Sequence, residues 1–382
     1  MRITFDAVPI CSDKMTGIGW CELGQTQALA ELYPTNKYEY SFFTSGDEER
    51  VKRVKKFAGK GIKLNTSKFS GFAYRAVSTF LPVPYSFFFG RKSDITHFFN
   101  YIIPPFVHGK KVVTVHDMVY KSFPGTVRGR TKYMLDIGLK RSMKRADLIV
   151  TDSEFSKSEI IKYFPRYENK IRVVPCGVDL ERFHPCEAPE RIPAVKKSLG
   201  IEGDYFLYVG TIEPRKNLER LITAYSAFVK KAGINAPKLV LAGGKGWLDQ
   251  GIYGRVEKLG LTDRVIFTKY VPSEDMNPLM CGALAFVFPS LYEGFGMPPL
   301  EAMACGVPVL ASGEASLPEV TGDCAVICDA YAPKSIADGM YRLYRDEELR
   351  QELGRKGLQR AQGFTWKRSA EILMEVYREL AK

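Results

Sequence analysis

The sequence predicts an α/β protein with two doubly wound parallel sheets, one in each half of the chain. Short runs rich in β-branched and aromatic residues alternate with helical segments throughout. This alternation starts again near residue 200, and 382 residues are enough for two domains. Hydrophobic residues make up 45% of the chain and charged residues 26%, which is typical of a globular protein and excludes extended disorder.

The first half contains strand-like runs that end at polar residues, Gly or Pro. In chain order they are MRITFDAV, KYEYSFF, DITHFF, KVVTVHD, DLIVTDS and KIRVVP. Helical patterns such as CELGQTQALAELY and TKYMLDIGLKRSMKRA separate them. A helix between two strands favours parallel pairing, because it returns the chain to the end of the sheet from which the first strand started. We therefore expect a first domain over residues 1–183.

The second half repeats this pattern after a segment rich in Pro and charge at residues 183–200, which is the expected linker. Its strand-like runs are DYFLYVG, PKLVLAGG, RVIFTKYV, LAFVFPS, VPVLAS and CAVICD. They predict a second domain over residues 200–364. The last segment, residues 365–382, has apolar residues at helical spacing. We expect it to form a helix that crosses back to cover the first domain.

The net charge of +12 is confined to the first half of the chain. Residues 1–180 carry 29 Lys and Arg against 17 Asp and Glu, whereas residues 181–382 carry 26 of each kind. Such a division indicates an anionic partner for the first half. The candidates are a membrane surface, a phosphate-bearing acceptor and nucleic acid. The sequence has no nucleic-acid recognition module and its basic residues are scattered, so we expect no nucleic-acid partner.

Residues 50–92 combine a basic run with an aromatic one. RVKRVKKFAGKGIKLNTSK is followed by FAYRAVSTFLPVPYSFFFGRK. Cationic and apolar side chains act together at anionic interfaces, so the segment is a candidate membrane-surface or lipid-acceptor site. The alternative is a surface helix followed by a core helix of the first domain. The sequence leaves both interpretations open.

The start of the chain is typical of a first strand rather than of a signal peptide, because MRITFDAVPI has one basic residue and a short apolar run. No stretch approaches the roughly 18 apolar residues of a membrane-spanning helix. We therefore expect a cytoplasmic protein that contacts at most the inner face of the membrane. Cys-x-x-Cys pairs and zinc-site spacing are absent from the sequence, so no metal or cofactor is expected.

Ligands of open parallel sheets bind beyond the carboxyl ends of strands, so Gly-rich turns at these positions are candidate sites. Gly17 and Gly19 follow the first strand and precede a helix expected to begin near Cys21. In the second half, YVGTIEPRKNLERLI places Arg215 and Lys216 where a helix begins. The helix dipole disfavours cations there, which makes better sense if the two side chains bind a diphosphate. The alternative is a solvated basic turn.

The segment FPSLYEGFGMPPLEAMACGVPVLAS, residues 288–312, carries the most information. Gly294 and Gly296 let backbone amides approach an anionic ligand before a helix expected after Pro298 and Pro299. Glu293 and Glu301 flank this turn, and carboxylates accept hydrogen bonds from the diols of a sugar or a ribose.

His116 follows another strand at the level where a ligand would lie. A structural role and a ligand-binding role are both open for this side chain.

These residues resemble a known family. The segment EGFGMPPLE is similar to the E-x7-E motif of the family 4 retaining glycosyltransferases, which have the GT-B fold of two Rossmann-like domains facing across a cleft. The Gly17–Gly19 loop, VHDM, ADLIVTDSEFSKSEI, VVPCGVD, VGTIEPRKN, YVPSED and FTWKRSA resemble family segments in the same order. The resemblance covers nearly the whole chain and is most specific in the second half, so the first domain is expected to bind the acceptor and the second the donor.

The resemblance implies roles for single residues in the second domain. Glu301 would bind the donor ribose, and the base would lie near Tyr270 and Val271. Lys216 would contact the diphosphate. The transferred sugar would be held by Glu293 together with the backbone amides of Phe295, Gly296 and Met297.

In the first domain, His116 would lie beside the reacting sugar, and Gly17 and Gly19 would approach the phosphates or the acceptor. One position departs from the family pattern. Many members have Arg directly after the glycine that ends the strand, and here Thr211 follows Gly210. We expect Arg215 to supply the missing charge.

The resemblance also implies a reaction. GTIEPRKN is similar to a subgroup rich in mannosyltransferases, so the expected activity is retaining transfer of mannose from GDP-mannose to a glycan or lipid-linked acceptor. The product would be a cell-surface polysaccharide. The chain has no Asp-x-Asp, which agrees with metal-independent transfer. A UDP-sugar donor is the main alternative. An epimerase or phosphorylase of the same fold, and a silent nucleotide-sugar binder, are less favoured.

Overall fold

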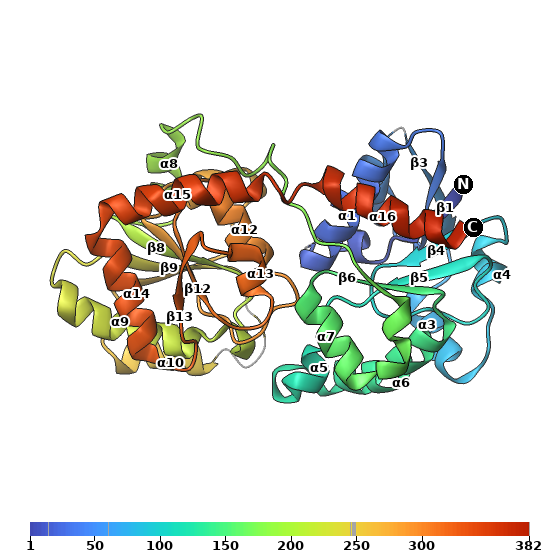
Figure 1. Ribbon diagram of the computed structural model, residues 1–382, viewed down its shortest axis with the longest axis horizontal. Coiled ribbons are helices and arrows are strands. Elements are labelled where there is room, and N and C mark those ends of the chain that lie inside the picture. The colour runs from blue at the N-terminus through green and yellow to red at the C-terminus, as the bar shows by residue number, and fades with distance from the viewer. Residues whose placement is uncertain (14, 60, 245, 247–249, 382) are drawn as a thin grey trace. The chain divides into compact units, whose positions relative to one another are not determined.

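The computed structural model of the chain describes residues 1–13, 15–59, 61–244, 246 and 250–381 (Figure 1). The chain divides into two compact units. The first unit contains Met1–Gly177 and Trp366–Lys382, and the second contains Val178–Thr365. Each unit is a parallel sheet with helices packed on it. The predicted α/β class with two doubly wound sheets is confirmed.

In the first unit, the described strands form one parallel sheet in the order β3-β2-β1-β4-β5-β6-β7. The strands are β1 (Arg2–Asp6), β2 (Lys37–Phe43), β3 (Ile62–Ser67), β4 (Ile95–Phe98), β5 (Lys110–Thr114), β6 (Leu148–Thr151) and β7 (Ile171–Val173). The order reverses between β1 and β4, which pair through Phe5 and His97. Loops after the strands on either side of such a reversal point diverge and leave room for a ligand.

The helices of the first unit connect these parallel strands, except for α16, which comes after the second unit in the chain. They are α1 (Gly17–Leu32), α2 (Glu48–Ala58), α3 (Gly71–Phe80), α4 (Tyr85–Phe89), α5 (Val119–Ser122), α6 (Gly129–Arg145), α7 (Glu154–Tyr163) and α16 (Trp366–Ala381). Three 3-10 turns occur in this unit, η1 (Pro9–Cys11), η2 (Pro124–Thr126) and η3 (Pro165–Lys170), counting the described residues.

The closing helix α16 belongs to the first unit. Its side chains Leu373, Met374 and Tyr377 are buried in the same core as β1 and α1. The Tyr377 hydroxyl lies 2.7 Å from His97 Nδ1, and His97 Nε2 lies 2.8 Å from the Thr114 hydroxyl. Burial lowers the pKa of His97 to about 3, so this imidazole is neutral. The end of the chain therefore completes the core of the domain that its beginning starts.

In the second unit, the described strands form a parallel sheet in the order β10-β9-β8-β11-β12-β13. They are β8 (Tyr205–Val209), β9 (Lys238–Ala242), β10 (Val265–Lys269), β11 (Ala285–Phe288), β12 (Val309–Ser312) and β13 (Ala325–Cys328). The helices are α8 (Arg191–Ser198), α9 (Leu218–Ala232), α10 (Gln250–Lys258), α11 (Ser273–Cys281), α12 (Met297–Ala304), α13 (Leu317–Thr321), α14 (Pro333–Arg345) and α15 (Glu347–Ala361). A short 3-10 turn, η4 (Pro214–Lys216), precedes α9.

Two expectations about the chain's organisation differ from the structure. Residues 183–200, predicted as a linker, lie within the second unit, where they include α8 and α8 packs against α11. Residues 178–183, predicted for the first domain, also belong to the second unit. The N–H of Val178 donates to the carbonyl of Phe364, and the side chain of Phe183 is buried. The Pro-rich sequence at this position therefore forms a loop and the helix α8 of the second unit rather than a free connection.

Strand β3 is absent from the predicted strands. Its sequence, IKLNTS, is mostly polar and lies in the basic segment, and only Ile62 is fully buried. Sheet-edge strands need little apolar sequence, because one side of the strand has no neighbour and part of each face stays in water. Hydrophobic patterning alone therefore misses it.

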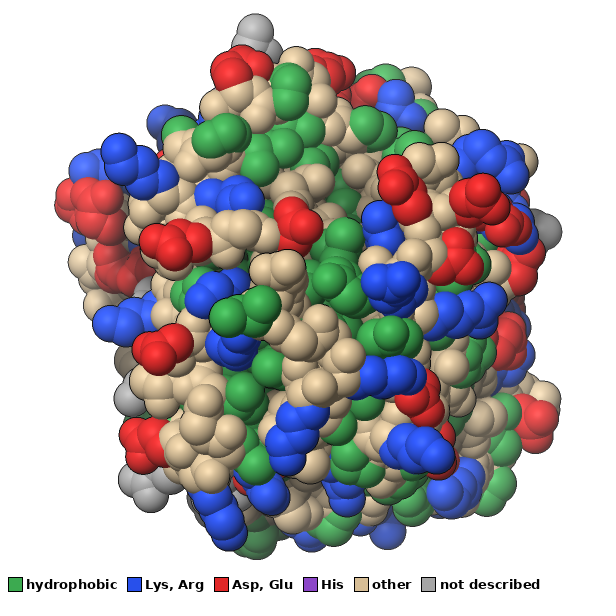
Figure 2. All heavy atoms as spheres, turned by 90° about the vertical axis from the view of Figure 1, so that its left-hand side faces the viewer, with side chains coloured by type: hydrophobic (Ala, Val, Ile, Leu, Met, Phe, Trp, Pro, Cys, Tyr) green, Lys and Arg blue, Asp and Glu red, His purple; other side chains and the backbone are tan. Residues whose placement is uncertain are grey.

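Charge on the second unit is mixed. Figure 2 shows one face of this unit, on which basic and acidic side chains are interspersed. This agrees with the equal numbers of the two kinds in residues 181–382. No helix in the described part of the chain is both long enough and apolar enough to span a membrane.

Candidate functional site

The turn after β8 brings two basic side chains to the carboxyl end of the second sheet. Gly210 has a φ of 155°, and η4 then carries Arg215 and Lys216. Asn217 follows in the left-handed conformation, with a φ of 63°, and α9 begins at the next residue. The Asn217 amide donates to the carbonyl of Pro289 at 2.9 Å and to that of Ala330 at 2.6 Å. These bonds tie the turn to the loops after β11 and β13.

Glu293 gathers the two cations into one cluster. Its Oε1 accepts a hydrogen bond from Lys216 Nζ at 2.7 Å, and its Oε2 accepts one from Arg215 Nη1 at 2.8 Å. The Ser290 hydroxyl also donates to Oε1, at 2.6 Å. Arg215 Nε in turn lies 2.7 Å from Glu213 Oε1. We call these residues, with Glu213 at the rim, the Glu293 cluster.

The Glu293 cluster is buried and ionised. Glu293 and Lys216 are each 6% exposed. Burial raises the pKa of Glu293, but the charges of Arg215 and Lys216 outweigh it and hold this pKa at about 2. Burial and the neighbouring Arg215 lower the pKa of Lys216, while Glu293 opposes the decrease. The cluster thus keeps two cations and a carboxylate in a place where none of them would be stable alone.

The loop that carries Glu293 is held in place by a serine from the next loop. The Ser316 hydroxyl lies 2.9 Å from the carbonyl of Glu293 and 2.7 Å from that of Phe295. Gly296 has a φ of 120°, and α12 begins at Met297. A side chain at Gly296 would also meet Leu317 at 2.8 Å. Among the first three residues of α12 only Met297 has a backbone N–H, because Pro298 and Pro299 have none.

Glu301 lies on the same helix but outside the Glu293 cluster. Its carboxyl is near Arg182 and Asp179. Burial raises the pKa of Glu301 to about 7, and the charge of Arg182 only partly offsets this. Tyr270 and Val271 follow β10; the Tyr270 side chain is exposed and that of Val271 is buried. Glu301 is thus a carboxyl whose charge changes near neutral pH.

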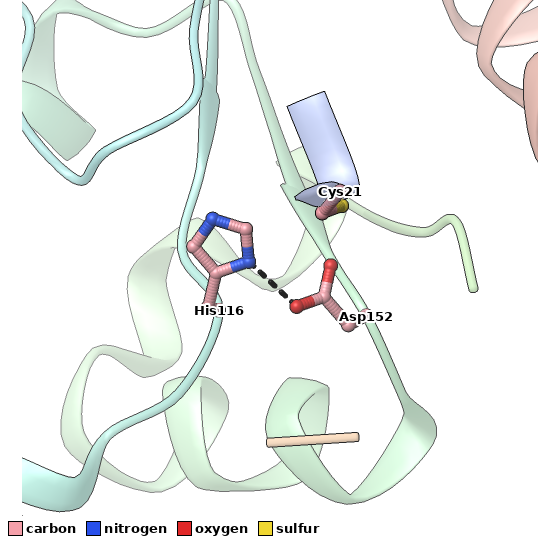
Figure 3. Close-up of side chains that lie close together, drawn as sticks. All are labelled: Cys21, His116 and Asp152. Carbon is pink, nitrogen blue, oxygen red and sulfur yellow. Dashed lines mark hydrogen bonds and ion pairs between the residues drawn. The ribbon is translucent and has the colours of Figure 1, made fainter. Parts of the chain in front are cut away.

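In the first unit, His116 is held from both sides. Figure 3 shows its Nδ1 directed at Asp152, 2.6 Å from Oδ2. Its Nε2 lies 2.8 Å from the carbonyl of Phe99. Burial lowers the pKa of His116, but the charge and hydrogen bond of Asp152 outweigh it and raise this pKa to about 10. The side chain is therefore a buried imidazolium with both ring nitrogens engaged.

Gly17 and Gly19 lie in the first turn of α1, which begins about one turn earlier than the predicted start near Cys21. Gly has a low intrinsic helix propensity, but tertiary packing favours a helix at these positions. A side chain at Gly19 would come within 3.0 Å of the carbonyl of Pro9, so the glycine lets α1 approach η1 closely. Gly17 is exposed at the helix start. The two residues therefore form a helix N-terminus rather than a free loop.

The structure brings Arg215, Lys216 and Glu293 together as one group, whereas Glu301 lies apart on α12. Sequence reasoning did not identify five polar side chains that hold these groups in place. They are Asp152, Glu213, Asn217, Ser290 and Ser316. The sequence did carry a signal for Asp152. This residue follows β6 just as His116 follows β5, and these two strands pair.

Comparison with known proteins identifies the family. The model of Glycosyltransferase Family 4 matches residues 25–182, and that of Glycosyl transferases group 1 matches residues 192–360. O-antigen chain mannosyltransferase B of Escherichia coli is 35% identical over 293 residues, which cover 76% of this chain and 75% of that protein. The chain belongs to glycosyltransferase family 4. The expected family and the general activity, glycosyl transfer, are confirmed.

Two further comparisons concern a relative in sequence and a neighbour in fold. The serotype-specific mannosyltransferase WbdA of Escherichia coli is 30% identical over 276 residues, which cover 71% of this chain but 34% of that protein. The Anabaena protein HepE, solved in complex with UDP and glucose, superposes with a TM-score of 0.75 at 16% identity, covering 99% of this chain and 100% of that one. This structural likeness concerns the fold, and it confirms the predicted GT-B architecture.

The Glu293 cluster predicts a pH-dependent stability. Glu293→Gln leaves two cations without their shared counter-charge, so the second unit should lose about 3–5 kcal/mol of unfolding free energy at pH 7. The pKa of Glu293 is about 2 in the folded chain and about 4.3 when unfolded. Its contribution is therefore present above about pH 4.3 and is lost as the pH falls toward 2.

Urea unfolding between pH 7 and pH 3 measures this effect. The difference between wild type and Glu293→Gln should narrow on the acid side of about pH 4.3. Glu352→Gln is the control, because Glu352 pairs with Lys356 at 2.7 Å in an exposed position and should change stability far less. A difference that stays constant down to pH 3 would show that the charge of Glu293 does not stabilise the fold.

Proposed function

We propose that this glycosyltransferase is a retaining, metal-independent enzyme that transfers mannose from GDP-mannose to a glycan or lipid-linked acceptor in cell-surface polysaccharide synthesis. The Glu293 cluster is the observation that carries the proposal. It places Lys216 and Arg215 just before α9, at the carboxyl end of a parallel sheet. Anionic ligands of such sheets bind at this end.

The cluster suits a departing diphosphate. Cleavage of the bond between the sugar C1 and the phosphate oxygen leaves negative charge on the diphosphate, and positioned cations stabilise that charge. Lys216 and Arg215 are assigned this role. Their side chains are already fixed by Glu293 before any ligand binds. Little reorganisation is then needed when charge develops, which is the main advantage of a preorganised site.

Glu293 can also accept a further hydrogen bond from a sugar. A carboxylate accepts about four hydrogen bonds. Lys216 and Ser290 bind its Oε1, and Arg215 binds its Oε2. One further acceptor position on Oε2 can take a hydroxyl of the transferred hexose. The backbone amides of Phe295, Gly296 and Met297, where α12 begins, are assigned as further donors to the same sugar.

The remaining donor contacts are assigned to neighbouring loops of the second unit. Glu301 is assigned to the ribose hydroxyls, because a half-buried carboxyl on α12 offers two acceptor atoms to a diol. Tyr270 and Val271 are assigned to the base, since an exposed aromatic ring can stack on it. Gly210 and Thr211 provide the turn after β8, where the backbone approaches the phosphates.

The first unit is assigned to the acceptor. His116 is placed beside the reacting sugar, and Gly17 and Gly19 are placed near the phosphates or the acceptor. The start of α1 at Gly17 supports the second assignment, because a helix N-terminus attracts anions. The basic excess of residues 1–180 supports an anionic acceptor or surface.

The proposed reaction passes through an oxocarbenium-like state. The acceptor hydroxyl attacks C1 from the face that the diphosphate leaves, and its proton goes to the departing phosphate oxygen. The anomeric configuration is thereby retained. The positive charge that stabilises the leaving group comes from Arg215 and Lys216 in this proposal, so no bridging metal is required.

The mannose donor is supported by the relatives. O-antigen chain mannosyltransferase B and WbdA both carry this activity in their names. A UDP-linked hexose is the second candidate, because the similarly folded HepE was solved with UDP and glucose.

Product analysis separates transfer from the remaining alternatives, since an epimerase would return an isomerised donor and a phosphorylase would release a sugar phosphate.

Peripheral contact with the inner face of the membrane is also proposed, through the first unit. The predicted surface helix is α2, whose basic residues include Lys55 and Lys56, and Lys60 of the same segment lies outside the described residues. In the aromatic part, Phe72 is 68% exposed and Phe87 is 80% exposed. Phe88 and Tyr74 instead pack on Phe43. The segment thus combines core aromatics with exposed ones that suit an interface.

Sedimentation with liposomes tests the membrane contact. The chain should pellet with vesicles containing anionic lipid at low salt, and Phe87→Ser should reduce the bound fraction severalfold, because the exposed ring no longer inserts. Ile234→Ser is the matched control, since Ile234 is 86% exposed in the second unit. Equal partition into neutral vesicles, or an equal loss in both variants, would contradict this contact.

Nucleotide binding tests the donor assignment. Without added metal, GDP-mannose and GDP should raise the melting temperature more than UDP-glucose, UDP-GlcNAc or UDP does. Because the pKa of Glu301 is about 7, its ionised fraction rises from roughly one tenth at pH 6 to nine tenths at pH 8. An ionised acceptor binds hydroxyls more strongly, so the affinity for GDP-mannose, whose diphosphate does not titrate in this range, should rise about threefold to tenfold.

Glu301→Gln should remove this pH dependence, because the amide does not titrate. Preference for UDP compounds would keep the glycosyltransferase assignment and overturn GDP-mannose as the donor. Glu301→Gln with an unchanged pH profile would instead exclude Glu301 from the ribose site.

A further inference from the structure

A second carboxylate, that of Glu213, binds the guanidinium of Arg215. Arg215 Nε lies 2.7 Å from Glu213 Oε1, whereas Arg215 Nη1 lies 2.8 Å from Glu293 Oε2. Glu213 directly precedes the 3-10 turn η4, and its backbone is extended, with a φ of −144°. Only Pro214 separates it from Arg215 in the sequence. Two carboxylates therefore bind one guanidinium through different nitrogen atoms.

The ion pair with Glu213 leaves the Glu293 cluster without a net charge. Lys216 and Arg215 bring two positive charges to it. Glu293 and Glu213 bring two negative charges, so the four cancel. Burial explains why Glu293 is needed, because Lys216 is 6% exposed and its Nζ lies 2.7 Å from Glu293 Oε1. The side chain of Arg215 is 20% exposed, so it keeps some contact with water and does not require a second carboxylate.

The backbone of the η4 turn is fixed by bonds that do not involve the side chain of Glu213. The carbonyl of Arg215 accepts a hydrogen bond from the Ser290 hydroxyl at 3.1 Å and one from the backbone N–H of Leu291 at 2.9 Å. Arg215 Nη1 also donates to the carbonyl of Tyr292 at 3.0 Å. Replacing the Glu213 carboxylate with a neutral amide should therefore leave Arg215 in place.

A carboxylate next to Arg215 opposes the binding of an anion to that side chain, and the opposition grows with the charge of the anion. In a nucleotide sugar, each of the two phosphates carries one negative charge. Cleavage of the bond to the sugar leaves a terminal phosphate whose second ionisation has a pKa of about 6. At pH 8 the nucleoside diphosphate therefore carries about one more negative charge than the donor. Glu213 must disfavour the product more strongly than the donor.

We propose that Glu213 is a positioning residue that acts through Arg215, lowers the affinity of the Glu293 cluster for the nucleoside diphosphate product and so speeds its release. The inference rests on the proposed function, in which Arg215 and Lys216 bind the departing diphosphate. Product release limits turnover in many enzymes. Two cations without an opposing charge would stabilise the leaving group but would also retain it after the transfer.

Calorimetric affinities of Glu213→Gln for GDP and GDP-mannose at pH 8 test the inference, and UDP and UDP-glucose replace them if the chain prefers uridine nucleotides. The amide keeps an acceptor oxygen for Arg215 Nε but removes the charge. GDP should bind about threefold to tenfold more tightly than it binds wild type, and GDP-mannose should gain less. The gain should shrink at high salt, which screens the remaining charges.

Glu219→Gln is the matched control for the affinities. It also removes one negative charge, from the first turn of α9, which follows η4. The side chain of Glu219 is 53% exposed and lies 3.8 Å from Arg255 rather than from the Glu293 cluster. This variant should bind GDP like wild type, because an exposed charge is screened by water.

Steady-state kinetics separate this role from a merely structural one. In Glu213→Gln, slower product release should lower kcat and the KM for the donor together, each by about threefold or more. A loss of order at Arg215 would instead raise the KM. Unchanged or weaker GDP binding by Glu213→Gln, an equal gain in Glu219→Gln, or a raised KM would overturn the inference.

Lys216→Met distinguishes a failure of this inference from a failure of the proposed function. Weaker GDP binding by Lys216→Met, without tighter binding by Glu213→Gln, would overturn the inference alone. GDP binding by Lys216→Met that equals wild type would contradict the proposed function and the inference with it. Circular dichroism confirms that each variant is folded.

Discussion

The candidate site of the second unit depends on the ion pairs that Glu293 makes with Arg215 and Lys216. One carboxylate holds Lys216 and Arg215, and through them it joins the turn after β8 to the loop after β11. Removing either sign would leave a charge in a place that water hardly reaches, because Glu293 and Lys216 are each 6% exposed. The cost of burying these groups is offset only when all three are present, so the two loops are fixed relative to each other without a ligand.

Serine and asparagine side chains complete this arrangement. Ser290 and Ser316 bind the Glu293 loop, and Asn217 adopts a left-handed backbone conformation that brings its amide to Pro289. A strained conformation persists where surrounding bonds determine it. The same principle operates in the first unit, where Asp152 and the carbonyl of Phe99 fix both nitrogens of His116. In both units the polar groups lie where parallel strands end.

Much of the fold could be predicted from the sequence, because buried parallel strands are apolar runs of recognisable length. Strand β3 could not be predicted in this way, because a polar edge strand has no apolar run. Helix α1 begins earlier than predicted, because Gly17 and Gly19 have low helix propensity and the close approach of Gly19 to Pro9 is a tertiary contact. The candidate residues Glu293, Arg215 and Lys216 were found from their positions next to helices. The ion pairs between these residues could not be predicted, because contacts between loops that are distant in sequence depend on tertiary structure.

The supporting residues were harder still to find. Ser290, Ser316 and Asn217 are common residue types in loops, and their sequence neighbours do not distinguish a structural hydrogen bond from exposure to water. Cys21 and Cys176 show the same limit, since they lie 155 residues apart in sequence and their sulfur atoms lie 3.4 Å apart in the structure. Topology, rather than local pattern, brings them together.

We propose that Glu293 and Lys216 act as one unit in binding the donor diphosphate. A double-mutant cycle tests it, with calorimetric affinities for the preferred nucleoside diphosphate in wild type, Lys216→Met, Glu293→Gln and the double variant. Each single change should weaken binding about tenfold or more, and the double variant should bind little worse than either single variant. Single variants that bind like wild type, or losses that multiply in the double variant, would contradict it.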